Sequence, residues 1–160
     1  MSDAATLLAA LRRRGWTVGI AESLTGGAVA AELVSVPGAS ATLLGGIVAY
    51  ATPVKRTLLG VDADLLATHG PVHADVAVQM ADGVRAAVAV DGRSADVGIS
   101  TTGIAGPDSP DGQPVGTVHV GVVTPAGRRS RSFLFAGDRT AVRSQAVDAA
   151  IVAALEWIGE

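Results

Sequence analysis

Three short segments of this 160-residue chain carry side chains that could do chemistry together. They have the sequences AESLTGG (21–27), YATPVK (50–55) and STTGIAGPDSPDG (100–112). Ser23 offers a hydroxyl that becomes a nucleophile when a base removes its proton. Lys55, the one lysine among 12 basic residues, carries an amine that can be this base once its pKa falls from about 10.4. Tyr50, the one tyrosine, could relay the proton or hold the amine.

In the first segment, Ser23 is predicted to stand at a turn from a strand to a helix, and Thr25, Gly26 and Gly27 to open that helix. Unpaired backbone N–H groups at a helix start can bind an anion or stabilise a developing oxyanion. The spacing matches neither the phosphate-binding loop nor the serine elbow of the α/β-hydrolases. The alternative interpretation is that Ser23 or Thr25 only caps the helix.

The other two segments also allow two interpretations. Lys55 is predicted in the first turn of a helix that reaches the Ser23 loop, or else it is a solvated surface charge beside a strand-end Tyr50. The third segment lacks the dinucleotide-binding fingerprint. Its backbone N–H groups from Gly103 to Gly106 and the hydroxyls of Thr101 and Thr102 suit a phosphate or an amide. The alternative there is a tight structural turn.

Further candidates are arginines and histidines. Arg139 and Arg143 fall near the start of the last predicted helix, where positive charge opposes the helix dipole. We therefore expect an anionic partner for them, either an acidic side chain or a ligand phosphate. His69, His73 and His119 have no spacing with acidic residues that indicates a metal site, so we expect capping or surface roles and no metal.

Composition narrows the class of protein. Hydrophobic residues make up 49% and charged residues 17%, which is typical of a folded domain. The absence of cysteine excludes disulfides, thiolate nucleophiles and sulfur-ligated zinc. A net charge of −3 argues against nucleic-acid binding. No apolar run reaches the ~18 residues that span a bilayer, and the start does not resemble a signal peptide, so we expect a cytoplasmic protein that does not contact membranes. Its alanine-rich, charge-poor surface suggests a homo-oligomer.

Helical and strand patterns alternate along the first two thirds of the chain. The predicted helices are 3–14, 25–36, 53–60, 62–69, 74–90 and one from 138 onward, and the predicted strands are 16–21, 45–50, 95–101, 117–124 and 130–135. Asp3 and Asp138 are the expected helix caps, and Gly15 the first helix stop. This order predicts one α/β domain over residues 1–160, a three-layer α/β/α sandwich with a mixed, mostly parallel sheet. Ligands of such folds gather beyond the carboxyl ends of the strands, where the three segments lie.

Four stretches of the chain together resemble one family. They are AESLTGG, GGIVAYATPVKRTLLGV, TTGIAGPDSPDGQPVGTVHVGV and AGDRTAVRSQAVDAAI, in that order and over nearly the whole length. The sequence resembles the C-terminal domain of the competence-damage-inducible CinA proteins. The resemblance implies a three-layer fold and, as in stand-alone members, hydrolysis of nicotinamide mononucleotide to nicotinate mononucleotide and ammonia without metal or cofactor.

The resemblance also implies roles for the residues of this chain that match the family's motifs. The resemblance implies that Ser23 attacks the amide, that Lys55 takes its proton and later protonates the departing ammonia, and that Tyr50 assists. The implied substrate contacts, which hold the oxyanion, phosphate or ribose, are Thr25, Gly26, Gly27, Thr102, Gly103, Gly106 and Arg139.

The chain also departs from the family pattern. Ala51-Thr52 stands where members often have Ser-Asn, and Gly70-Pro71-Val72-His73 where many have Gly-Ala-Val-Ser. The loop 108–112 is less glycine-rich than usual, which leaves substrate preference open. Many relatives carry an additional N-terminal domain, for which we expect no room here. Two alternatives stay open: a non-catalytic nucleotide-binding or interaction module in which Lys55 pairs with phosphate, and an amidase for another small amide.

Overall fold

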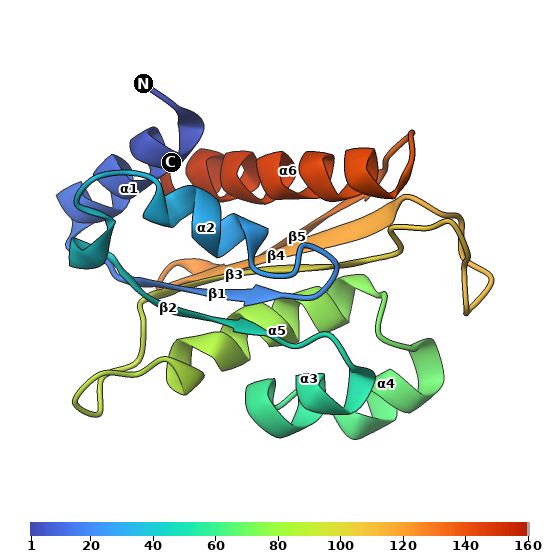
Figure 1. The fold of residues 1–160 in the computed structure, drawn as a ribbon. Helices are drawn as coiled ribbons and strands as arrows, with labels where there is room; N and C mark the ends of the chain where they lie inside the picture. The colour runs from blue at the N-terminus through green and yellow to red at the C-terminus, as the bar shows by residue number, and fades with distance from the viewer. Residues whose placement is uncertain (160) are drawn as a thin grey trace.

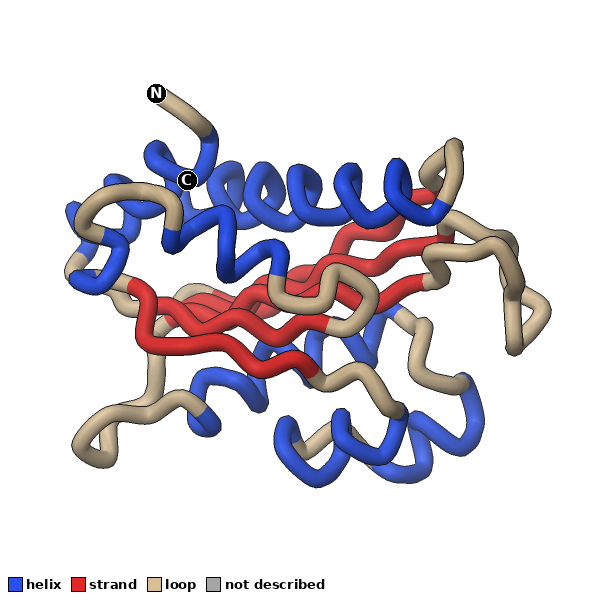
Figure 2. The backbone as a smooth tube through the Cα atoms, viewed as in Figure 1, coloured by secondary structure: helices blue, strands red, loops and turns tan. Residues whose placement is uncertain are grey.

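A five-stranded sheet forms the middle layer of the molecule (Figures 1 and 2). The computed structural model describes residues 1–159. The strands are β1 (Val18–Glu22), β2 (Leu43–Val48), β3 (Val97–Gly103), β4 (Thr117–Thr124) and β5 (Gly127–Leu134), in the order β2-β1-β3-β4-β5. β1 pairs in parallel with β2 and β3, whereas β4 is antiparallel to both β3 and β5. Four strands therefore run in one direction, which confirms the mixed, mostly parallel sheet.

Helices cover both faces of the sheet (Figure 1). One face carries α1 (Asp3–Arg14), α2 (Ala28–Val34) and α6 (Arg139–Gly159), and the other carries α3 (Thr52–Leu59), α4 (Ala63–His69) and α5 (Ala74–Ala87). A 3-10 turn, η1 (Ala39–Ala41), precedes β2. The larger apolar core lies between the sheet and the layer of α1, α2 and α6. The predicted three-layer sandwich is thus confirmed. None of the helices in residues 1–159 is both long and apolar enough to cross a membrane.

α5 lies unusually close to the sheet because two strand positions have no side chain. A Cβ atom on Gly98 would lie 1.7 Å from the carbonyl oxygen of Ala81, and one on Gly121 would lie 2.3 Å from that of Ala77. Only glycine permits backbones to approach this closely. The N-terminal end of α5, and the segment 70–73 before it, are thereby held beside the carboxyl end of β3.

Several element ends differ from the sequence predictions. Ser2, and not Asp3, caps α1, because the Ser2 hydroxyl accepts a hydrogen bond from the Ala5 N–H at 3.2 Å. Residues 25–27 form a turn and α2 begins only at Ala28, since Gly26 and Gly27 have φ of 61° and 103°, outside the right-handed helical region.

Other boundaries moved by a few residues. The helix predicted over 74–90 ends at Ala87, β3 continues to Gly103, and β5 begins at Gly127. The predicted roles of Gly15 as the stop of α1 and of Asp138 as a cap are confirmed, because the Asp138 carboxylate accepts the Ala141 N–H at 2.9 Å.

Candidate functional site

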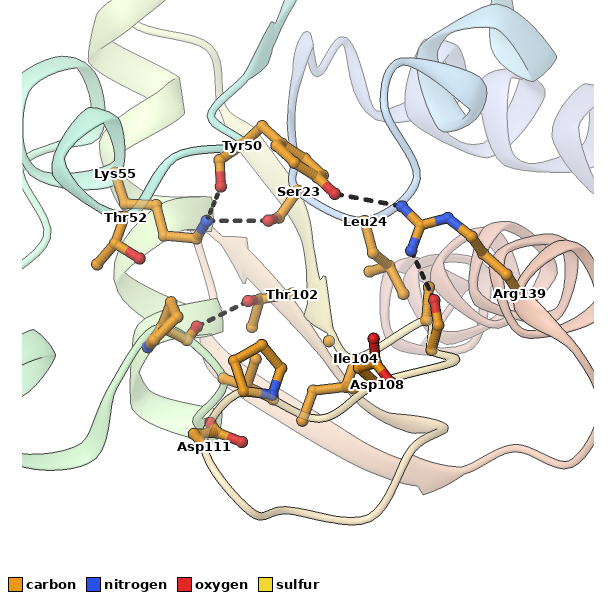
Figure 3. Close-up of a pocket in the computed structure, with 16 residues that line it drawn as sticks. Ser23, Leu24, Tyr50, Thr52, Lys55, Thr102, Ile104, Asp108, Asp111 and Arg139 are labelled. Atoms are coloured by element: carbon orange, nitrogen blue, oxygen red, sulfur yellow. Dashed lines mark hydrogen bonds between the residues drawn. The ribbon is translucent and has the colours of Figure 1, made fainter.

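The three segments singled out in the sequence meet at the carboxyl edge of the sheet. Strand register places Glu22, the last residue of β1, opposite Val48 of β2 and Thr101 of β3. The chain leaving each strand there lines a pocket of about 420 Å³ (Figure 3), within the size range of small-molecule sites. Its walls include Ser23, Leu24, Tyr50, Lys55, Thr102 and Arg139.

Lys55 is a buried lysine in the first turn of α3. Its side chain is 1% exposed, and its Nζ lies 2.9 Å from the Ser23 Oγ. The same nitrogen donates to the backbone carbonyls of Ala49 at 2.8 Å and Tyr50 at 3.2 Å. Removal from water disfavours the ammonium form, so burial lowers the pKa of Lys55 from 10.5 to about 8.

The three contacts of the Lys55 nitrogen can be made by the ammonium, which donates to Ser23 and to both carbonyls, and also by the neutral amine. An ammonium group has three N–H donors and no acceptor, whereas a neutral amine has two donors and one lone pair. The two carbonyls can take the two donors of the neutral amine, which leaves the lone pair directed at the Ser23 hydroxyl. This geometry is what a general base needs next to a serine nucleophile.

The lowered pKa of Lys55 predicts a pH-dependent stability difference. Because the pKa is about 8 in the folded protein and 10.5 without burial, the folded state binds fewer protons across that window, and its stability rises with pH there. Below pH 8 both states carry the ammonium group and the burial penalty is full. The free energy of unfolding of Lys55→Met minus that of wild type should therefore be larger at pH 7 than at pH 10, by about 2–3 kcal/mol. Urea unfolding of both proteins at each pH measures this difference.

The control for that measurement is Arg56→Met, on the same helix turn but exposed. Arginine keeps its proton throughout this pH range. The difference in free energy of unfolding between Arg56→Met and wild type should therefore be the same at pH 7 and pH 10. Equal pH dependence in the two variants would contradict a lowered pKa for Lys55.

Glu22 is a buried carboxylate that the sequence analysis missed. It is 1% exposed, and its two oxygens accept hydrogen bonds from the Thr25 hydroxyl at 2.6 Å and from the backbone N–H groups of Val29 at 2.9 Å and Ala30 at 3.0 Å. It therefore satisfies the first N–H groups of α2. The available signal was an acidic residue closing an otherwise apolar strand just before a helix.

The predicted contacts at Thr25, Gly26 and Gly27 do not line the pocket. The Thr25 side chain is fully buried, and its hydroxyl lies 2.8 Å from that of Thr101. The Gly26 N–H donates to the Ser23 carbonyl at 3.1 Å, closing a tight turn. Because Glu22 occupies the N–H groups of α2, the helix start itself is not an open anion site. Within the described chain, the backbone N–H groups of Leu24 and Thr25 have no acceptor.

Tyr50 contacts Lys55 through its backbone and not its ring. The side chain is 61% exposed, and its hydroxyl lies 3.2 Å from Nη2 of Arg139. Arg139 also donates to the Gly106 carbonyl at 2.7 Å, so it ties the third segment to the second at the pocket mouth (Figure 3). The Tyr50 side chain is therefore placed to hold Arg139, while its carbonyl holds the amine.

The other predicted residues of the third segment lie on the pocket wall. Thr102, Gly103 and Gly106 all line it, and the Thr102 hydroxyl donates to the Pro71 carbonyl at 2.7 Å. Thr52 also lines the pocket.

Arg143 does not reach the pocket. Its guanidinium binds the backbone carbonyls of Leu24 at 2.9 Å and Thr25 at 3.3 Å. The sequence predicted an acidic side chain or a phosphate as the partner of this arginine, but its partners are carbonyl oxygens.

The histidines hold no metal-ligand cluster in residues 1–159. His73 caps α5 by accepting the Asp75 N–H at 3.1 Å, as the capping role predicted. His119 lies 2.7 Å from the Ser132 hydroxyl, and burial, with the nearby His73 as a lesser cause, lowers its pKa.

Known proteins are similar to this chain in sequence and in fold. A CinA-like protein of Frankia casuarinae is 46% identical over 145 residues, and one of Salinibacter ruber is 49% identical over 133 residues. These alignments cover 91% and 82% of this chain but 32% and 31% of the relatives, so the chain spans about a third of the length of the curated relatives it matches.

Solved structures agree over the whole fold. The CinA superfamily protein KP700603 of Klebsiella pneumoniae has a TM-score of 0.91 at 33% identity, covering 98% of this chain and 96% of that one. A competence/damage-inducible protein of Agrobacterium tumefaciens has a TM-score of 0.88 at 30% identity, covering 100% and 98%. The family model of the CinA C-terminal domain matches residues 2–158. The family model, the sequence identity and the fold thus agree, and the chain belongs to the CinA C-terminal domain family.

Proposed function

We propose that this protein is an amidohydrolase that converts nicotinamide mononucleotide and water to nicotinate mononucleotide and ammonia. One observation carries the proposal: the buried amine of Lys55 lies 2.9 Å from the Ser23 hydroxyl at the wall of a nucleotide-sized pocket. Serine activated by a neighbouring base is the arrangement used for acyl transfer. The family resemblance supplies the substrate.

The reaction runs in two halves. The Ser23 oxygen attacks the amide carbonyl carbon while Lys55 takes the hydroxyl proton, giving a tetrahedral intermediate. Lys55 then gives that proton to the amide nitrogen, the C–N bond breaks, and ammonia leaves an ester of Ser23. Water, deprotonated by Lys55, attacks this ester, and the proton returns to the Ser23 oxygen as nicotinate mononucleotide departs. Lysine performs both transfers because its lowered pKa, about 8, is close to neutrality.

The negative charge that develops on the carbonyl oxygen needs donors beside Ser23. The N–H group of Leu24 follows Ser23 directly at the pocket wall and has no acceptor among the described residues. A backbone donor next to the nucleophile, at the start of a tight turn, stabilises the oxyanion in many acyl-transfer enzymes. In this proposal it replaces the N–H groups of residues 25–27 that the sequence predicted.

The direct test is to incubate the protein with nicotinamide mononucleotide and to measure ammonia and nicotinate mononucleotide. Equal amounts of the two products are expected. Turnover of other small amides, but not of this nucleotide, would replace the proposed substrate and keep the proposed chemistry. Nucleotide binding with no turnover of any amide would overturn both and favour the non-catalytic module.

The pH profile of the reaction should report Lys55. The base is active when neutral, so kcat/KM should rise with pH and level off above an apparent pKa of about 8. Well below that pKa the rate should fall about tenfold for each pH unit. Tyr50→Phe should keep the same midpoint, because Tyr50 contacts the amine through its carbonyl. A profile that is flat between pH 6 and pH 9 would contradict Lys55 as the base.

Arg139 is the proposed phosphate contact at the pocket mouth. Arg139→Met should raise KM for nicotinamide mononucleotide roughly 10- to 100-fold, as expected for the loss of a hydrogen bond to a charged group, with little change in kcat. The same variant should not raise KM for nicotinamide riboside, which lacks the phosphate. Arg93→Met, on an exposed loop before β3, is the control and should leave both KM values unchanged. Equal effects on nucleotide and riboside would assign Arg139 a different role.

A further inference from the structure

We infer that Arg143 is a positioning residue that holds the loop after Ser23, and with it the Leu24 N–H of the oxyanion hole, in place. This inference rests on the proposed function, because it assigns a role within the same reaction. Arg143 lies in the second turn of α6, one helical turn beyond Arg139, and does not line the pocket. It therefore acts on the reaction only through the Ser23 loop.

The guanidinium of Arg143 holds the loop from outside. Its Nε donates to the Leu24 carbonyl at 2.9 Å, and its Nη2 donates to the Thr25 carbonyl at 3.3 Å. On the inner side, the Glu22 carboxylate binds the Thr25 hydroxyl. The loop directly after Ser23 is thus fixed between a cation and an anion that each bind it through hydrogen bonds.

Peptide geometry turns this contact into an orientation of the N–H groups. A trans peptide is planar, so its N–H points away from its own carbonyl. With the Leu24 carbonyl bound to Arg143, the N–H of Thr25 in the same peptide must face the opposite direction. In the preceding peptide the Ser23 carbonyl accepts the Gly26 N–H, which likewise directs the Leu24 N–H away from that bond.

The donor that reaches the pocket is unused within the protein. Leu24 lines the pocket, and its backbone N–H has no acceptor in the described part of the chain, whereas Thr25 is fully buried behind it. Buried N–H groups are almost always paired, so an unpaired donor beside a nucleophile points to an acceptor that arrives with the substrate. Without Arg143, the Leu24–Thr25 peptide can rotate, and the Leu24 N–H before it loses its alignment.

The position of Arg143 also permits chemical rescue. It borders an open groove between α2 and α6 that contains the acidic residues Glu32 and Asp148. If the side chain is shortened to alanine, a small guanidinium ion can enter this groove and bind the two carbonyls. If Arg143 served only to pack α6 against α2, added guanidinium would not restore catalysis.

The test compares Arg143→Ala and Arg143→Lys with wild type. Arg143→Ala should lower kcat about 10- to 100-fold, somewhat less than the loss of an oxyanion donor itself, with KM within about threefold of wild type. Millimolar guanidinium should restore part of kcat, and Arg143→Lys should retain more kcat than Arg143→Ala. Arg85→Ala is the control, because Arg85 is a helical arginine whose Nε donates to a loop carbonyl, that of Ala95, at 3.1 Å. It should leave kcat unchanged and show no rescue.

A substrate-independent measurement separates this inference from the proposed function. A fluorophosphonate phosphonylates an activated serine: the Ser23 oxygen bonds to phosphorus, fluoride leaves, and Lys55 takes the proton. Intact-mass measurement should show slower labelling in Arg143→Ala than in wild type, and faster labelling when guanidinium is added. If wild type is labelled but does not hydrolyse nicotinamide mononucleotide, the proposed substrate fails and the labelling rates still test Arg143. Unchanged kcat and labelling in Arg143→Ala, a rise in KM alone, or no labelling of wild-type Ser23 would each overturn the inference.

Discussion

Lys55→Arg is expected to lower kcat for nicotinamide mononucleotide hydrolysis by about 10³-fold, within the usual range for loss of a general base. Arginine keeps a positive charge at the position but does not release its proton near neutral pH. Every hydrogen-bond donor of the Lys55 ammonium is used by Ser23, Ala49 and Tyr50, so this side chain has none left for a phosphate. Nucleotide affinity, measured by calorimetry, should therefore survive the loss of turnover.

Two further variants guard against misfolding at this buried position. Lys55→Met has similar length and no charge, and it should be as inactive as Lys55→Arg while unfolding cooperatively. Arg56→Met, exposed on the same helix turn, should keep wild-type kcat. If Lys55→Arg keeps turnover within tenfold of wild type and is folded, another group must be the base. If it instead loses binding together with turnover, Lys55 is a ligand contact and the non-catalytic module becomes the better explanation.

Ser23→Ala is the second change with a large expected effect. Removing the nucleophile should lower kcat by about 10⁴-fold or more, as in serine hydrolases whose nucleophile is replaced. The pocket, Lys55 and the backbone donors of the loop remain, so the affinity for the nucleotide should stay within a few-fold of wild type. Stopped reactions of the wild type, analysed by intact mass, should contain an ester of Ser23 that Ser23→Ala lacks.

The matched control is Ser35→Ala. Ser35 is an exposed serine at the end of α2 whose hydroxyl bonds only the Glu32 carbonyl among the described residues. This variant should retain full kcat and carry no ester. Turnover by Ser23→Ala above a few per cent of wild type would show that water attacks the amide directly, with Lys55 as its base.

The position of the site followed from local patterns in the sequence. Apolar runs and helix caps are local patterns of neighbouring residues. They located the strands and the helices between them well enough to predict a mostly parallel sheet. Parallel strands bring their carboxyl ends to one edge of the sheet, which predicts that Ser23, Lys55 and Thr102 meet there, and all three line the pocket. The helix predicted to open at Thr25 was wrong because two glycines with positive φ extend the turn to Gly27.

The sequence by itself therefore determined the layers of this protein, the family it belongs to and which loops meet. Tertiary structure alone decided the burial and the lowered pKa of Lys55, the partners of Glu22 and Arg143, and the direction of the Tyr50 side chain. The physical reason is that these contacts join residues far apart in the sequence. The 2.9 Å contact of Lys55 with Ser23 joins residues 32 positions apart, and the contact of Arg143 with Leu24 joins residues 119 positions apart. Such distances depend on strand register and on how closely helices approach the sheet, which no local pattern of residues encodes.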